Sequence, residues 1–466
     1  MTTGKKTLRQ KVYSFPRGGI SFEDHSVPSR DSCVTAFLPS LSVIPLIQHS
    51  GGRAYPIVSV GEMVKEGMLI GRGQGPGSAN VHATVPGRVI RMAAWKSAGE
   101  QVRDGLVIRM EGCFEKLGKR LEAYAWEGML PYDIQRIIAD FGIVEMEGSG
   151  RPVSDIISSF RSAPEPITLV VRCVFDDPWL AADYVLCRER AKAIAEGAAI
   201  AARTCRVSRI IYAISQGERE LGDELMAAGS KWGIPTATVL VGSRYPQRNR
   251  RELELVLRSY GKKEGLELGS LFVLGPATLA AVYDAVRLRK PILERYIAVG
   301  GSAVKQPQVM KVRIGTRFRE IFAECGGFKG TPKRIAVGSP LLGQPITDLD
   351  EPVIKTSYAI FALLEDFDRE SQNGCISCGE CRNVCPVRLD PEELYKRTLI
   401  DAKGDSYQHV SAGRSYGTAP ERAAAGPDWK SYTYTPACHG CGCCELVCPS
   451  RLPLSAAIAS YALKEK

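Results

Sequence analysis

The segment CISCGECRNVCP, residues 375–386, decides the C-terminal part of the fold, and CHGCGCCELVCP repeats its pattern at 438–449. Both segments match C-x2-C-x2-C-x3-C-P. In two-cluster ferredoxins such a run places three closely spaced thiolates around one [4Fe–4S] cubane, and the cysteine before proline reaches the other cubane. We therefore predict a two-cluster, ferredoxin-like helical domain over 365–460.

The register of the two segments assigns each cysteine to a cluster. The eight predicted ligands form two sets, Cys375, Cys378, Cys381 and Cys448 for one cluster and Cys438, Cys441, Cys444 and Cys385 for the other. A ninth cysteine, Cys443, stands beside Cys444, and the register favours Cys444 as the ligand. The alternative is a pair of zinc sites, but zinc prefers C-x2-4-C pairs or mixed Cys/His sets, which fit this spacing less well.

Composition limits the class of protein. A chain of 466 residues with 44% hydrophobic and 24% charged residues predicts several globular domains. Nine of the fifteen cysteines lie between Cys375 and Cys448 at metal-ligand spacings, which is typical of a reducing compartment. The net charge of +10 is spread along the chain, so we expect an acidic protein partner or anionic lipid headgroups and no nucleic acid.

Targeting signals are not apparent. The N-terminal residues MTTGKKTLRQKVYSF contain no apolar segment of the kind found in secretory signals. No run reaches the ~18 consecutive apolar residues of a membrane helix. We expect a cytoplasmic chain that meets a membrane only through partners.

Residues 1–115 predict a small β-sandwich, because short β-branched strands are separated by Gly61, Gly67, Gly71 and Gly87. The repeated V-x-x-G pattern resembles the biotinyl/lipoyl hammerhead fold. The segment between the two halves, RGQGPGSAN, carries no lysine for a swinging cofactor. We therefore interpret this domain as a scaffold.

The next region alternates strands and helices over 130–262. Apolar strands at 167–175, 208–215 and 236–242, with an Ala-rich helix between the first two, predict a parallel α/β sheet whose ligands bind beyond the carboxyl ends of the strands. Gly148 and Gly150 are candidates for a phosphate-binding loop, although a plain connecting loop is an open alternative.

Two further segments lie between this sheet and the end of the chain. Several short strands around one helix at 276–288 predict a small α+β module over 265–345. Residues 401–432 separate the two cysteine segments, and their polar, aperiodic sequence predicts a flexible insertion.

Taken together, these residues resemble the RnfC subunit of the Rnf ion-translocating oxidoreductase complexes, nearly from end to end. The likeness rests on FPRGGI (15–20), VIPLIQH (43–49), VHATVPGRV (81–89), YP (245–246), PILER (291–295), GSPLLG (338–343) and the doubled cysteine motif. It implies that 265–345 is a soluble-ligand-binding β-grasp module. It also implies that the α/β domain is similar to the NADH-binding flavoprotein subunit of respiratory complex I, with FMN and NAD as cofactors.

The departures from the family pattern fall on that nucleotide site. The family's flavin loop, roughly GGAGFPT, is EGSGRPV at 147–153, its acidic turn is RCVFDDP at 172–178, and its Gly-rich stretch after YP is QRNR at 247–250. FMN and NAD are therefore weaker expectations than the two clusters, and no catalytic residue is assigned.

The resemblance implies a peripheral electron-transfer subunit of an ion-translocating oxidoreductase, a translocase, on the cytoplasmic side of the inner membrane. It would pass electrons between NADH or a low-potential carrier, ferredoxin or flavodoxin, and membrane subunits. Two alternatives stay open. One is an electron-transfer and scaffold subunit that has lost flavin and NADH binding, and the other is a soluble corrinoid-type reductase.

Overall fold

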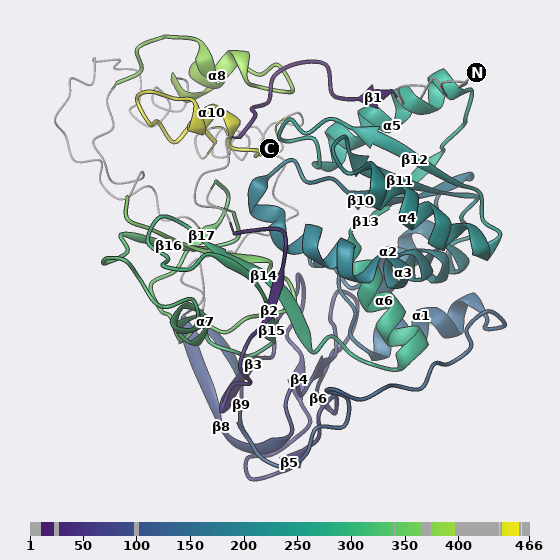
Figure 1. Cartoon of the computed structure of the whole chain (residues 1–466), viewed down its shortest axis with the longest axis vertical. Helices are drawn as coiled ribbons and strands as arrows, with labels where there is room; N and C mark the ends of the chain where they lie inside the picture. Colours follow the sequence, from purple (N-terminus) through teal and green to yellow (C-terminus); the bar gives the residue numbers. More distant parts are fainter. Residues whose placement is uncertain are drawn as a thin grey trace, which may run out of the picture.

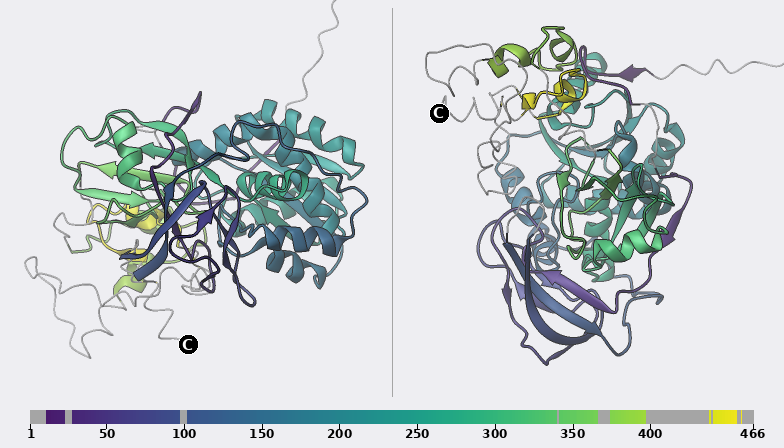
Figure 2. Two further views of the ribbon diagram at one scale, coloured as in Figure 1. Left: turned by 90° about the horizontal axis from the view of Figure 1, so that it is seen from below. Right: turned by 90° about the vertical axis from the view of Figure 1, so that its left-hand side faces the viewer.

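The computed structural model describes residues 11–22, 28–96, 102–339, 341–365, 374–396, 438, 440–455 and 458. The predicted insertion at 401–432 lies outside these residues. The N-terminal sandwich and the cysteine loops lie at opposite ends of the molecule, with two sheet-containing modules side by side between them (Figures 1 and 2). Within the described ranges, no helix is long and apolar enough to cross a membrane.

A five-stranded parallel sheet in the order β1-β12-β11-β10-β13 forms the centre of the α/β module. Its strands are β1 (Val12–Tyr13), β10 (Ile167–Cys173), β11 (Arg209–Ser215), β12 (Thr236–Val241) and β13 (Ser270–Leu274). Alternate residues of β11 enter different hydrophobic clusters, with Tyr212 in one and Ile211 in the other. Both faces of the sheet are therefore covered, which explains the unbroken apolar runs in the sequence.

Helices pack on both faces of this sheet (Figure 1). They are α1 (Pro131–Asp140), α2 (Val153–Arg161), η1 (Pro178–Leu180), α3 (Ala181–Thr204), α4 (Arg219–Gly229), η2 (Ser230–Trp232), α5 (Arg250–Glu264) and α6 (Pro276–Leu288). Helix α5 packs on the face opposite α3 and α6. A Cβ on Gly197 of α3 would lie 2.0 Å from the carbonyl oxygen of Leu279, so the glycine lets α3 and α6 approach closely.

The sequence analysis assigned β13 and α6 to the following module, whereas the structure places both in the α/β module. Strand β13 pairs in parallel with β10, with Ile167 opposite Ser270 and Val171 opposite Leu274. The short apolar strand and single helix fit either type of module, and only the long-range pairing with β10 distinguishes the two.

A mixed six-stranded sheet in the order β17-β16-β18-β14-β15-β2 forms the neighbouring module. Its elements are β2 (Cys33–Thr35), β14 (Glu294–Gly300), β15 (Gln308–Arg313), α7 (Phe318–Glu324), β16 (Arg334–Val337), β17 (Gln344–Pro345) and β18 (Ala359–Leu363). Strand β18 lies beyond the predicted module end at 345, and β2 comes from the N-terminal region. Each supplies backbone partners that residues 265–345 lack.

Two small antiparallel sheets form the N-terminal sandwich. One sheet contains β3 (Leu41–Pro45), β5 (Met63–Val64), β8 (Gly87–Lys96) and β9 (Val102–Met110), and the other contains β4 (Tyr55–Pro56), β6 (Leu69–Arg72) and β7 (Val81–His82). Ile44, Ile70 and Leu106 are fully or almost fully buried in the core shared by the two sheets.

Candidate functional site

The two cysteine segments fold alike. Their short helices, α8 (Glu380–Asn383) and α10 (Cys443–Leu446), each follow a glycine in the left-handed region, Gly379 at φ +77° and Gly442 at φ +78°. Glycine adopts this conformation without steric cost. Positive φ angles recur at further matching positions of the two segments, Ser377 with Gly440 and Arg388 with Arg451. The repeat in sequence is therefore a repeat in backbone conformation.

Four cysteines line one cavity at the end of the molecule. They are Cys375, Cys378, Cys381 and Cys448, so the first segment supplies three thiols and the second supplies one. Leu452 and Leu454 form part of the wall and are almost fully buried. Four thiols around an apolar concavity match the donor set of a [4Fe–4S] cluster.

The other four predicted ligands also come together. Burial raises the pKa of the Cys438 thiol to about 11, and the neighbouring Cys441 and Cys385 add to the rise. The thiols of Cys385 and Cys438 accept backbone N–H bonds from Leu389 at 3.2 Å and Gly440 at 3.4 Å. Thiols that oppose one another's ionisation become thiolates when a cationic metal group lies between them. This donor set therefore also fits a cluster.

The ninth cysteine faces the α/β module. Cys443 is fully buried and packs with Tyr245 and with the neighbouring predicted ligand Cys441, whose pKa it raises, and it lies outside the cavity of the first set. The Tyr245 hydroxyl donates a hydrogen bond of 2.7 Å to the carbonyl oxygen of Cys441. Cys443 thus belongs to the contact between the cysteine loops and the α/β module.

The N-terminal segment Phe15–Ile20, called the strap here, completes this contact. The backbone N–H of Gly19 donates to the carbonyl oxygen of Val384 at 2.8 Å, and that of Ile20 donates to the carbonyl oxygen of Tyr245 at 2.9 Å. Gly18 has φ +68°, and a Cβ there would lie 2.7 Å from the backbone of Cys385. The two glycines therefore allow the strap to lie directly against a predicted ligand loop.

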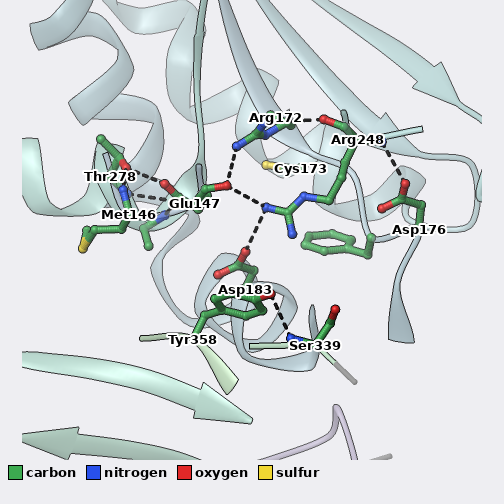
Figure 3. Close-up of polar contacts among 12 residues, drawn as sticks. Met146, Glu147, Arg172, Cys173, Asp176, Asp183, Arg248, Thr278, Ser339 and Tyr358 are labelled. Atoms are coloured by element: carbon green, nitrogen blue, oxygen red, sulfur yellow. Dashed lines mark hydrogen bonds and ion pairs between the residues drawn. The ribbon is translucent and has the colours of Figure 1, made fainter. Parts of the chain in front are cut away.

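A second polar site lies at the carboxyl end of β10, where the sequence predicted the nucleotide (Figure 3). The Glu147 carboxylate accepts hydrogen bonds from the N–H of Ala277, the N–H of Thr278 at 3.0 Å and the Thr278 hydroxyl. Ala277 and Thr278 belong to the first turn of α6. Backbone N–H groups at a helix N-terminus form an anion site, and a side chain of this chain fills it.

Two arginines lie beside Glu147 (Figure 3). Arg172 donates to the carbonyl oxygen of Glu147 at 3.0 Å, and burial lowers its pKa, with Arg248 adding to the fall. Arg248 lies 3.8 Å from an Asp183 carboxylate oxygen, and its backbone N–H donates to Asp176 at 2.8 Å. Burial alone would lower the pKa of Arg248, but Asp183 and Asp176 outweigh it and raise the value.

Burial also raises the pKa values of the acids at this edge. It raises the pKa of Asp176 to about 7 and that of Asp177 to about 6, in each case against the charge of Arg248. We call the side chains of Glu147, Arg172, Asp176, Asp183 and Arg248 the edge network. It pairs charges of both signs at the position predicted for a nucleotide.

The loop predicted to bind phosphate makes its hydrogen bonds within the chain. The N–H of Ser149 donates to Glu145 at 2.6 Å, and a Cβ on Gly148 would lie 2.5 Å from the same carboxylate. Gly150 has φ +66°, and its carbonyl oxygen accepts from the N–H of Ser50 at 3.0 Å. The loop contacts a neighbouring glutamate and the N-terminal sandwich.

Sequence reasoning did not find the edge network. One signal was available, because Arg172 interrupts the apolar strand ITLVVRC and a buried strand rarely contains a charge without a partner. The residues that pair around it come from four separate segments, and no local pattern connects them.

Family models match all four modules. Residues 14–113 match the RnfC barrel sandwich hybrid domain, 138–283 the Nuo51 FMN-binding domain, 296–347 the SLBB domain and 371–452 the 4Fe-4S dicluster domain. These matches confirm the fold class predicted from the sequence for each module.

Curated relatives extend over most of the chain. The RnfC subunit of the ion-translocating oxidoreductase complex of Rhodobacter capsulatus is 34% identical, over 84% of this chain and 76% of the relative. The chain belongs to the RnfC family. The corresponding subunit of the proton-translocating ferredoxin:NAD(+) oxidoreductase complex of Clostridium ljungdahlii is 28% identical, over 84% of this chain and 86% of its own length. The corresponding subunit of the Na(+)-translocating ferredoxin:NAD(+) oxidoreductase complex of Acetobacterium woodii is 26% identical, over 78% of this chain and 83% of its own length.

Membership in the RnfC family confirms the sequence-based recognition and the role in electron transport within an ion-translocating oxidoreductase complex. The dicluster domain accounts for two [4Fe–4S] clusters. The match to an FMN-binding domain favours FMN more strongly than the sequence analysis did, and the edge network lies inside that domain.

Proposed function

We propose that this protein carries electrons between a low-potential protein carrier, of the ferredoxin or flavodoxin class, and membrane subunits of its complex. The two cysteine sets are the observation that carries this proposal. Each set combines three thiols of one segment with one of the other, so the two clusters share a single small scaffold. The clusters supply one-electron transfer, and the loops hold them at the end of the molecule.

The role of the surrounding residues follows from their contacts. Leu452 and Leu454 exclude water from one side of the first set. The backbone N–H groups of Leu389 and Gly440 donate to the sulfurs of Cys385 and Cys438, and such hydrogen bonds stabilise the reduced, more negative cluster. We infer that the chain associates peripherally with the cytoplasmic side of the membrane through those partner subunits.

The residues of the edge network do not fit the phosphate of FMN. The two first-turn amides of α6 that would bind a phosphate already bind the Glu147 carboxylate, and a second anion beside it would be repelled. A Cβ on Gly275 would lie 2.3 Å from the Glu147 side chain, so this glutamate also occupies the space next to the helix. We infer that electrons enter this chain without a flavin or NAD at this edge.

The test is anaerobic reconstitution of the full chain with iron, sulfide and FMN, followed by desalting. We expect two clusters and substoichiometric FMN, with the cluster absorption bleached by reduced ferredoxin but not by NADH. A Cys441→Ser variant serves as the control with one impaired cluster.

The possible results separate the two parts of the proposal. Stoichiometric FMN with NADH-dependent bleaching would overturn flavin-free entry while leaving cluster-based transfer intact. Failure of ferredoxin to reduce fully loaded clusters would overturn the proposed carrier.

A further inference from the structure

A cavity of about 340 Å³ lies where the N-terminal sandwich, the α/β module and the six-stranded sheet meet. Its walls include Glu66 of the sandwich, the segment 116–119 that follows it, α6, β14 and β15. Met146 and Arg295 line the cavity and also contact each other, with 3.1 Å between the guanidinium and the Met146 sulfur. The cavity is therefore a separate site that borders the edge network.

All three acids in the cavity wall are already paired with cations of the wall. Glu66 lies 2.9 Å from Arg313, and Asp284 lies 2.6 Å from Arg190. Glu294 lies 3.3 Å from Lys290 and 3.1 Å from Lys311. The negative charge of the wall is consequently neutralised by the wall itself.

Three further cations of the wall have no carboxylate within ion-pair distance among the residues that the structure describes. They are Lys116, Lys119 and Arg295. Arg295 is only 4% exposed, and its guanidinium donates to the carbonyl oxygen of Ser357 at 3.0 Å and to the Met146 sulfur. Burial lowers the pKa of Arg295, and the more distant carboxylates of Asp183 and Glu147 offset this only in part, so an anion in the cavity would stabilise the guanidinium further.

The local electrostatics agree with this charge count. Although burial alone would raise the pKa of Glu294, the neighbouring Lys290 and Lys311 hold it at about 2. The wall holds seven lysine and arginine side chains against three acids, so its net charge is positive. The remaining wall is apolar and includes Ala277, Ala280 and Ala281 of α6, whose small side chains leave room for the organic part of a ligand.

We propose that this cavity binds a small organic phosphate. Lysine and arginine together recognise phosphate, and a phosphate dianion matches the excess of cations better than a single carboxylate. The volume falls within the range of ~300–1,000 Å³ found for small-molecule sites. The alanine-rich face of α6 contacts the apolar body, and the phosphate lies toward Lys116, Lys119 and Arg295.

The proposal is tested by calorimetric titration of the reconstituted full chain with AMP, with pyrophosphate and with adenosine, which lacks the phosphate. We expect saturable binding of at least one phosphate probe, no binding of adenosine, and weaker binding as the salt concentration rises. The variant Lys116→Glu/Lys119→Glu replaces the exposed Lys119 and the half-buried Lys116 together. It leaves the buried Arg295 in place. This variant should lower the affinity for the phosphate probe by at least about tenfold, the equivalent of about 1.4 kcal/mol.

Lys329→Glu makes the charge change of one of these two substitutions at an exposed position outside the cavity, and it should leave the affinity unchanged. Retention of the cluster absorption shows that each variant is folded. The proposal is wrong if neither AMP nor pyrophosphate saturates the chain, if adenosine binds equally well, or if Lys329→Glu weakens binding as much as the double variant. Should FMN copurify, loss of FMN in the double variant would place it in this cavity rather than at the edge network.

Discussion

Replacement of Glu147 by alanine should loosen the N-terminal turn of α6. The change removes a carboxylate that accepts two backbone N–H bonds and one hydroxyl bond from Ala277 and Thr278. Loss of a helix-capping side chain costs ~1 kcal/mol, and hydrogen bonds to a charged group are worth ~1.5–3 kcal/mol each, without simple additivity. We expect the local opening free energy of this turn to fall by about 2 to 3 kcal/mol.

Hydrogen exchange measured by mass spectrometry on peptides covering 274–288 reports this quantity directly. At about 1.4 kcal/mol per factor of ten, exchange in the first turn should accelerate about 30- to 150-fold. Glu147→Gln keeps an acceptor oxygen and loses the charge. We therefore expect the local opening free energy to fall by about 1 kcal/mol and exchange in the first turn to accelerate about fivefold. Because the measurement is local, it does not require the whole chain to unfold in a single step.

Glu145→Gln is the neighbouring control, since Glu145 lies two residues away and contacts Ser149 and Arg172 but not α6. It should accelerate exchange around 148–151 and leave 274–288 unchanged. If the exchange rate of α6 in Glu147→Ala differs from that in the parent chain by less than about threefold, the carboxylate is not what holds this helix N-terminus.

Three further outcomes can be measured on the reconstituted chain. Cys441→Ser should lower the iron content from about eight per chain toward about four, whereas Cys443→Ser should keep about eight; equal losses would contradict the assigned ligand sets. Gly18→Ala forces a Cβ into the backbone of the ligand loop and should also reduce iron loading, whereas Gly128→Ala, with nothing within 4 Å of the added Cβ, should not. His82 has a pKa lowered by burial from 6.5 to about 3, so the unfolded chain takes up a proton before the folded chain does, and stability falls as the pH drops below 6.5. His82→Gln should reduce the fall in thermal midpoint between pH 6.5 and pH 4, and an unchanged slope would argue against this residue as its source.

The cysteine sets were predictable because their information is local. Spacing within each segment determines which thiols share a loop, and the doubled motif implies the exchange of Cys385 and Cys448 between sets. The structure places Cys448 with the cysteines of the first segment around one cavity. The ligand roles themselves remain predictions until iron is measured in the variants.

The edge network was not predictable in the same way. Glu147, Arg172, Asp183 and Arg248 meet only because a parallel sheet brings several segments to one edge. A departure from the family's flavin loop was visible in the sequence. That one of the departing residues, Glu147, binds the N-terminal amides of α6 was not visible there. The assignment of β13 to its sheet failed for a related reason, since a short apolar strand carries no information about its distant partner.

The strap has a consequence for the order in which the protein is assembled. Val12, just before the strap, pairs with Leu240, and Gly18 and Gly19 of the strap pack on the loop that carries Cys385. These residues therefore find their partners only after a long stretch of chain beyond them has been made. Contacts of such high sequence separation are costly to form early, and they are expected to form late. A molecule whose strap is in place is then one in which the loop that carries Cys385 has already been made.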